Sequence, residues 1–259
     1  MIAKINYVWR VIGTALGFAS FGLGGLLIAL FVAPFAKLIH RDPERQAIFT
    51  QKVIKYAFRT FIEGLKFGGV MTYDVKNLHK LENSYGELVV ANHPCLLDVV
   101  MLIAFMPRAN CVVKQALWQN PFTHAPVKSA GYILNQGSQT FIDACINKLQ
   151  TEQAGSLIIF PEGTRTERQQ MLNDFQRGAA NIAVRANVPI RPVLIRCTPS
   201  TLTKNEKWYH IPNRAFHLEL DVLDAIDIQH ILPNVEINPK GVRQFNAWLY
   251  DFFKRELAK

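Results

Sequence analysis

Hydrophobic residues near the start of the chain form one long run. Residues 11–36 contain no charged side chain, and a helix of this length reaches about 39 Å, more than the roughly 30 Å of a bilayer hydrocarbon core. The run therefore predicts a membrane-associated helix. Gly13 and Gly17 form a GxxxG pattern, which favours close helix packing. The pattern leaves open whether the helix spans the bilayer, re-enters one leaflet or is buried in a protein core.

The next segment, residues 46–66, places apolar and basic residues at helical spacing. The turns between its apolar positions carry the basic residues Lys52, Lys55, Arg59 and Lys66. This pattern predicts a basic amphipathic helix whose apolar stripe either covers the core or lies in the lipid headgroup layer. We therefore expect an N-terminal membrane anchor over residues 1–70 and a second domain over residues 71–259.

After residue 70 the pattern changes to short apolar runs that are typical of strands. Residues 86–92 and 156–160 are such runs, and each leads directly into a turn that contains proline. Residues 215–223 alternate like a half-buried strand, and residues 241–257 return to helical spacing. These elements predict an α/β fold, a mixed central sheet flanked by helices, with the N-terminal membrane-associated helical segment attached.

Composition and charge narrow the possible partners. The 259 residues are 49% apolar with a net charge of +9, which is too hydrophobic for a disordered binding arm. Residues 37–80 hold nine Lys and Arg against four Asp and Glu, whereas the count from residue 203 onward is eight against eight. Basic charge beside the apolar run favours a bilayer partner over nucleic acid. The positive-inside rule then predicts the cytoplasmic (inner) membrane, with the second domain on the cytoplasmic side.

The cysteines and histidines show no metal-binding pattern. The four cysteines form no CxxC pair, which argues against structural zinc and favours buried thiols in a reducing compartment. Four histidines outside the motifs described below have no mutual spacing typical of metal ligands: His124, His210, His217 and His230. We therefore expect neither a metal nor a cofactor.

The stretch ANHPCLLD, residues 91–98, places a histidine and a carboxylate five positions apart. Pro94 is suited to the first position of a helix, which predicts His93 as the N-cap residue. From the cap, the imidazole can turn toward Asp98, and a carboxylate that accepts the Nδ1 proton leaves Nε2 as a base for a hydroxyl. The alternative is an ordinary helix start, with an aspartate favoured by the helix dipole.

A second polar motif follows the other apolar run, in SLIIFPEGTR, residues 156–165. Ligands of open α/β sheets gather at the carboxyl ends of the strands, where both motifs are expected. Arg165 can bind a phosphate or carboxylate, Gly163 allows close backbone approach, and Thr164 adds a hydroxyl group. Taken alone, the motif is also compatible with a plain turn.

Together, NHPCLLD and FPEGTR resemble the motifs of the glycerolipid acyltransferase family, whose bacterial type member is 1-acylglycerol-3-phosphate acyltransferase. The similarity continues in FQRGAANIAVRANVPIRPVLI and covers roughly residues 85–200. It implies transfer of a fatty acyl group from acyl-CoA or acyl carrier protein to the hydroxyl of a lysophospholipid, with 1-acylglycerol-3-phosphate as the leading acceptor, in phospholipid biosynthesis.

The resemblance also implies roles for the motif residues. His93, oriented by Asp98, would act as general base without a covalent acyl-enzyme. The acceptor's anionic head would be held by Gly163, Thr164 and Arg165, with Glu162 shaping or assisting the site. A cysteine nucleophile at Cys95 is disfavoured, because nothing in the sequence indicates a lowered thiol pKa.

One departure from the family concerns the acceptor. The family usually has a Gly-x-Ile-Phe-x-x-Arg strand after a segment like VVKQ, whereas here GYILNQG ends at Gly137. Either Lys114, Lys128 or Arg177 supplies the missing cation, or the enzyme acylates a different lipid-like or non-phosphorylated acceptor.

A hypothesis of another functional class is a catalytically inactive membrane-binding protein. A hydrolase is disfavoured because the chain has no GxSxG motif.

Overall fold

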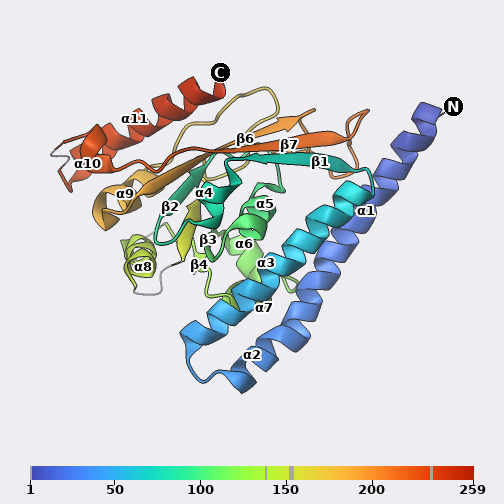
Figure 1. Cartoon of the computed structure of the whole chain (residues 1–259), viewed down its shortest axis with the longest axis horizontal. Helices are drawn as coiled ribbons and strands as arrows, with labels where there is room; N and C mark the ends of the chain where they lie inside the picture. Colours follow the sequence, from blue (N-terminus) through green and yellow to red (C-terminus); the bar gives the residue numbers. More distant parts are fainter. Residues whose placement is uncertain (1, 138, 152–154, 234–235) are drawn as a thin grey trace.

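A pair of long N-terminal helices runs beside an α/β domain (Figure 1). The computed structural model describes residues 2–137, 139–151, 155–233 and 236–259. The first helical stretch is continuous through three elements: α1 (Ile2–Leu27), a π-helical turn (Ile28–Val32) and α2 (Ala33–Ile39). After a short turn, α3 (Pro43–Phe67) returns beside it. Asp42 caps α3 by accepting from the amides of Glu44 and Arg45.

Glycines allow α1 to approach the end of α3 closely. A Cβ atom added at Gly13 would lie 2.7 Å from Cγ2 of Val70, and one added at Gly17 would lie 3.0 Å from Cδ2 of Leu65. Larger residues would separate the two helices. The close packing predicted from the GxxxG pattern is therefore present in the structure.

The two N-terminal helices differ in how much apolar surface they bury. Residues Lys4–Ile39 form a helix long and apolar enough to cross a membrane, and only 11% of its most apolar stretch is buried. On α3, by contrast, Ile54 and Ile62 are 3% and 0% exposed within the main core. The stripe of α3 therefore covers the protein core, while α1 leaves an apolar face open.

The described residues form a seven-stranded mixed sheet in the order β1-β7-β6-β2-β5-β3-β4. Among the strands that the structure describes, only β6 and β7 pair antiparallel, so β1 and β7 run opposite to the other five strands. The strands are β1 (Met71–Lys76), β2 (Leu88–Ala91), β3 (Ala109–Val113), β4 (Ile133–Leu134), β5 (Ser156–Ile159), β6 (Ile190–Thr198) and β7 (Phe216–Val222).

Helices cover both faces of this sheet, which confirms the predicted fold class (Figure 1). One face packs against α3, α4 (Leu78–Glu82) and the apolar α5 (Asp98–Phe105). The other packs against α8 (Gln139–Gln150), α9 (Arg177–Ala186) and α11 (Pro239–Leu257). Three short helices complete the described elements: α6 (Gln115–Gln119), α7 (His124–Ser129) and α10 (Ile228–Ile231). The predicted domain division at residue 70 stays a prediction; in the structure, α3 shares a core with the sheet.

Candidate active site

His93 and Asp98 lie at the carboxyl end of β2 and contact each other directly. Nδ1 of His93 is 2.9 Å from Oδ2 of Asp98. The Asp98 side chain is fully buried, whereas the imidazole is 16% exposed. An ionised carboxylate only accepts hydrogen bonds, so the imidazole proton belongs on Nδ1. Nε2 of His93 is then left to accept a proton from a substrate.

The segment between the two residues is a turn. Helix α5 begins at Asp98, so the predicted helix start at Pro94 is wrong. The amide of Cys95 donates to Oδ2 of Asp98 at 2.7 Å, and this side-chain bond closes a turn that competes with the helix. The same carboxylate oxygen therefore shapes the turn and orients His93.

Glu162 joins this turn to the segment that follows β5. Its Oε1 accepts from the amide of His93 at 2.7 Å, and its Oε2 accepts from the amide of Asn173 at 2.9 Å. The Thr166 hydroxyl donates to both oxygens, at 3.1 and 2.9 Å. The Thr166 amide also donates to the His93 carbonyl at 2.7 Å. Since protein donors occupy both oxygens, the geometry suits Glu162 to shaping the site.

Both carboxyl groups are buried, and this changes their protonation equilibria. Burial raises the pKa of Asp98 above its ordinary value, and the hydrogen bond from His93 opposes the rise. Burial likewise raises the pKa of Glu162, against the hydrogen bonds from the amides of Asn173 and His93 and from Thr166. The hydrogen bonds to each carboxylate thus offset part of the cost of burying its charge.

Arg165 lies in the turn after β5. Its Nη1 donates to the carbonyl of Leu202 at 2.8 Å, and its positive charge acts on the Asp98 carboxylate. Gly163 has a φ of +66°, a conformation that favours glycine. Thr164 and Arg165 are partly exposed. A guanidinium has five N–H donors, so Arg165 can bind a phosphate and still keep its bond to Leu202.

The other candidate cations lie in different parts of the fold. Lys114 is exposed directly after β3, and Gly137 is exposed just beyond the neighbouring β4. Lys128 lies on α7. Arg177 is the exposed first residue of α9, and the amide of the residue before it donates to the Pro161 carbonyl at 2.7 Å. Arg177 is thereby held beside the turn that contains Arg165, whereas Lys114 is two strands away from β2.

Two further residues support His93 and were not singled out from the sequence. The imidazole stacks on the ring of Phe160, with centroids 4.1 Å apart. Asn92 is 1% exposed and exchanges two hydrogen bonds with the backbone of Ile195 in β6, at 2.8 and 2.7 Å. Asn92 directly precedes His93, and Phe160 directly precedes the Pro-Glu turn. This position within a motif is the sequence feature that could have identified each of them.

Cys95 is a buried thiol next to the pair. A hydrogen bond with Cys197, together with burial, raises its pKa well above the ordinary thiol value. The thiolate is the nucleophilic form, so this environment disfavours nucleophilic catalysis by Cys95.

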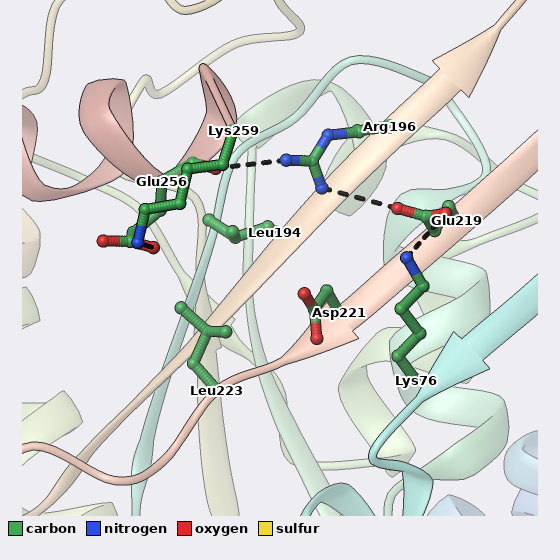
Figure 2. A pocket seen from close by; sticks show the side chains of 8 residues that line it. All are labelled: Lys76, Leu194, Arg196, Glu219, Asp221, Leu223, Glu256 and Lys259. Carbon is green, nitrogen blue, oxygen red and sulfur yellow. Dashed lines mark hydrogen bonds and ion pairs between the residues drawn. The ribbon is translucent and has the colours of Figure 1, made fainter.

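A cavity of about 300 Å³ elsewhere on the sheet has a different character. Figure 2 shows that its charged groups point toward one another: Lys76 and Arg196 flank Glu219, at 3.1 and 3.5 Å. Arg196 also donates to the carbonyl oxygens of Glu256 and Leu257 at the end of α11. These paired charges connect β1, β6 and β7 with the C-terminal helix, and neither His93 nor Asp98 lines this cavity.

Comparison with known proteins finds a family match for part of the chain and several relatives. Residues 72–196 match the family model described as Acyltransferase. A Caenorhabditis elegans protein named for 1-acyl-sn-glycerol-3-phosphate acyltransferase is 31% identical over 66% of this chain and 61% of its own length. The 1-acyl-sn-glycerol-3-phosphate acyltransferase of Helicobacter pylori is 33% identical over 46% of this chain and 53% of its own length. The chain thus spans less than two thirds of either relative.

A solved structure supports the same fold. The crystal structure of the 1-acyl-sn-glycerophosphate acyltransferase PlsC from Thermotoga maritima matches with a TM-score of 0.69 at 21% identity, over 96% of both chains. The matched family region contains both polar motifs of the site. Residues 72–196 therefore match the acyltransferase family, and the fold of the chain is that of a solved acyltransferase structure.

Proposed function

We propose that this protein transfers a fatty acyl group from acyl-CoA or acyl carrier protein to the hydroxyl of a lysophospholipid, with 1-acylglycerol-3-phosphate as the leading acceptor, in phospholipid biosynthesis. The observation that carries the proposal is the His93–Asp98 pair held next to the Arg165 turn at one edge of the sheet. The names of the relatives point to the same reaction.

The proposed chemistry follows from the geometry of the pair. Nε2 of His93 takes the proton of the acceptor hydroxyl as the oxygen attacks the thioester carbonyl. Asp98 holds the imidazole in the required tautomer and stabilises the imidazolium that forms. The tetrahedral intermediate then expels the thiolate of the donor, which takes up the proton. No covalent acyl-enzyme is needed.

The acceptor's anionic head is assigned to the turn after β5. Arg165 supplies a fork of donors to a phosphate, and Gly163 and Thr164 lie beside it in the turn. Arg177 is the best placed replacement for the arginine missing at position 137, because its helix begins next to this turn. Lys114 is the second candidate, at the end of β3.

The structure favours attachment to one leaflet. Arg10 donates to the carbonyls of Pro212 and Asn213, and a Cβ added at Gly25 would lie 2.4 Å from the Phe122 carbonyl oxygen. These loops accompany α1 along much of its length. If α1 crossed the bilayer, their irregular backbone would enter the hydrocarbon, where unsatisfied polar groups are costly. We therefore place α1 and α2 along the cytoplasmic (inner) membrane surface, with the catalytic domain on the cytoplasmic side.

The first experiment is acyl transfer by purified wild type and His93→Ala side by side. Radiolabelled acyl-CoA and acyl carrier protein would be offered with lysophosphatidate, glycerol 3-phosphate and non-phosphorylated hydroxy-lipids. We expect acylation of lysophosphatidate by the wild type and a loss on the order of 10²–10⁴-fold in the variant. Near-normal rates in the variant would refute the role of His93.

A second candidate function is acylation of a non-phosphorylated acceptor, which the absence of arginine at Gly137 favours. Transfer only to neutral or zwitterionic acceptors would support it. No transfer to any acceptor by the wild type would support the inactive membrane-binding alternative, which the intact His93–Asp98 hydrogen bond argues against.

A further inference from the structure

The segment between β6 and β7, residues 199–215, carries three consecutive aromatic rings, Trp208, Tyr209 and His210. We call this segment the aromatic strap. Trp208 and Tyr209 are 41% and 42% exposed, with ring centroids 5.5 Å apart. Tyr209 also packs against the ring of His210 at 4.8 Å. Large aromatic side chains clustered at the surface indicate an interaction site.

The aromatic strap lies against the flank of α1. The ring of Trp208 is 5.9 Å from the ring of Phe18. Arg10 is only 3% exposed, and it holds the strap through the carbonyls of Pro212 and Asn213, both at 2.7 Å. The strap is therefore fixed against α1 at a point where the Phe18 ring is itself 39% exposed.

One face of α1 is strongly apolar. It is a stripe of large side chains between 47% and 61% exposed, namely Ile5, Val8, Trp9, Ile12, Leu16 and Leu23. The strap adds aromatic rings beside this helix, and its exposed Lys207 and Arg214 add positive charge. Aromatic rings beside an apolar surface, together with basic residues, are typical of groups at the headgroup level of an anionic membrane.

The strap also reaches the candidate active site. Arg165 donates to the carbonyl of Leu202, near the start of the strap. Ion pairs continue this contact, from Glu167 to Lys204 at 3.1 Å and from Arg168 to Glu206 at 3.3 Å. One continuous segment thus connects the surface beside α1 with the turn assigned to the acceptor's head.

We propose that the aromatic strap is a second membrane-contact element, which places Trp208 and Tyr209 in the headgroup layer of an anionic bilayer beside α1. This inference rests on the proposed attachment of the chain to one leaflet. The strap sets the depth of the Arg165 turn relative to the lipid, so that an acceptor's phosphate is within reach while its acyl chain stays in the bilayer.

Tryptophan fluorescence tests this placement without any acyl donor. Full-length variants would each retain one tryptophan, with the other three changed to Phe. They would be mixed with phosphatidylglycerol vesicles whose acyl chains are brominated at carbons close to the headgroup. We expect quenching of the variant retaining Trp208, comparable to that of the variant retaining Trp9 on α1. The control variant retains Trp248 on α11, which covers the opposite face of the sheet, and should stay unquenched.

Vesicle partitioning provides a second measurement. The double variant Trp208→Ala/Tyr209→Ala should bind anionic vesicles about tenfold more weakly, and Trp248→Ala should bind like the wild type. Circular dichroism would establish that each variant is folded. The proposal fails if Trp208 is unquenched while Trp9 is quenched, or if Trp208 is buried by self-association without lipid. Since no turnover is measured, these outcomes are independent of whether the chain transfers acyl groups.

Discussion

Substituting Asp98 by Asn should separate the catalytic role that we propose for this residue from its structural one. Oδ2 of Asp98 accepts from His93 Nδ1 and from the Cys95 amide, and an asparagine oxygen in the same position can accept both bonds. The new NH₂ group would replace Oδ1, which has no hydrogen-bond partner among the described residues. The turn should therefore persist, while the imidazolium loses its counter-charge.

The expected effect on catalysis is large. Proton transfer by a positioned base typically contributes 10²–10⁴-fold, and without the carboxylate His93 no longer has a stabilised imidazolium. We expect kcat to fall by roughly 10²–10⁴-fold, with little change in the acceptor KM. The acyl-transfer assay with varied lysophosphatidate measures both constants.

The effect on stability should have a characteristic pH dependence. Because burial raises the pKa of Asp98, the folded protein binds more protons than the unfolded chain above the ordinary value of 3.8. The stability contributed by protonated Asp98 is complete below that value and is lost as pH rises through the folded pKa. The unfolding free energy of Asp98→Asn should therefore rise relative to wild type from acid to neutral pH, by about 1.4 kcal/mol per pH unit between the two pKa values.

Denaturant unfolding in detergent at several pH values would measure this slope. The unpaired NH₂ group of the asparagine costs about 1–3 kcal/mol at every pH, so the slope is more informative than the absolute difference. A near-normal kcat would refute the catalytic role of the pair. A stability difference that is constant with pH would refute the argument about the buried charge.

Two further substitutions test the acceptor site and the membrane helix. Arg165→Ala should raise the acceptor KM about 10- to 100-fold, since a hydrogen bond to a charged group contributes about 1.5–3 kcal/mol. Steady-state kinetics would show it, and an effect on thermal stability alone would indicate a structural turn. Gly25→Ala should cost about 1–3 kcal/mol in thermal unfolding, because its Cβ would meet the Phe122 carbonyl oxygen at 2.4 Å. Gly22→Ala is the matched control, because a Cβ added there would meet no described atom within 4 Å outside its chain neighbours and the nearby backbone of its own helix. Equal behaviour of the two variants would contradict the packing.

The features that sequence predicted well are local ones. The long apolar helix, the amphipathic α3 and the strands that lead into the two motifs each follow from a pattern within one segment. The helix start at Pro94 failed because the Asp98 side chain bonds to the Cys95 amide, and residue preferences at helix ends do not include such a bond.

The order of the strands in the sheet could not be predicted from the residue pattern of any single segment. β7 lies between β1 and β6 in the sheet. It pairs antiparallel with β6, and the aromatic strap connects these two strands. Pairings between distant strands depend on which apolar faces meet in the core, and many partners satisfy the same alternating pattern. The position of the strap beside α1 likewise depends on Arg10, far away in the sequence.

The hydrogen bonds between the two motifs also could not be predicted from the sequence. They bear on the role that we propose for His93. Glu162 accepts from the amide of His93, and Thr166 donates to its carbonyl, so both bonds use the backbone alone. Any residue other than proline at position 93 could make them. These backbone bonds therefore do not require an imidazole there, and the ring itself contacts Asp98 and Phe160. His93→Ala should consequently retain the loop geometry, and its loss of activity can be interpreted as loss of the base.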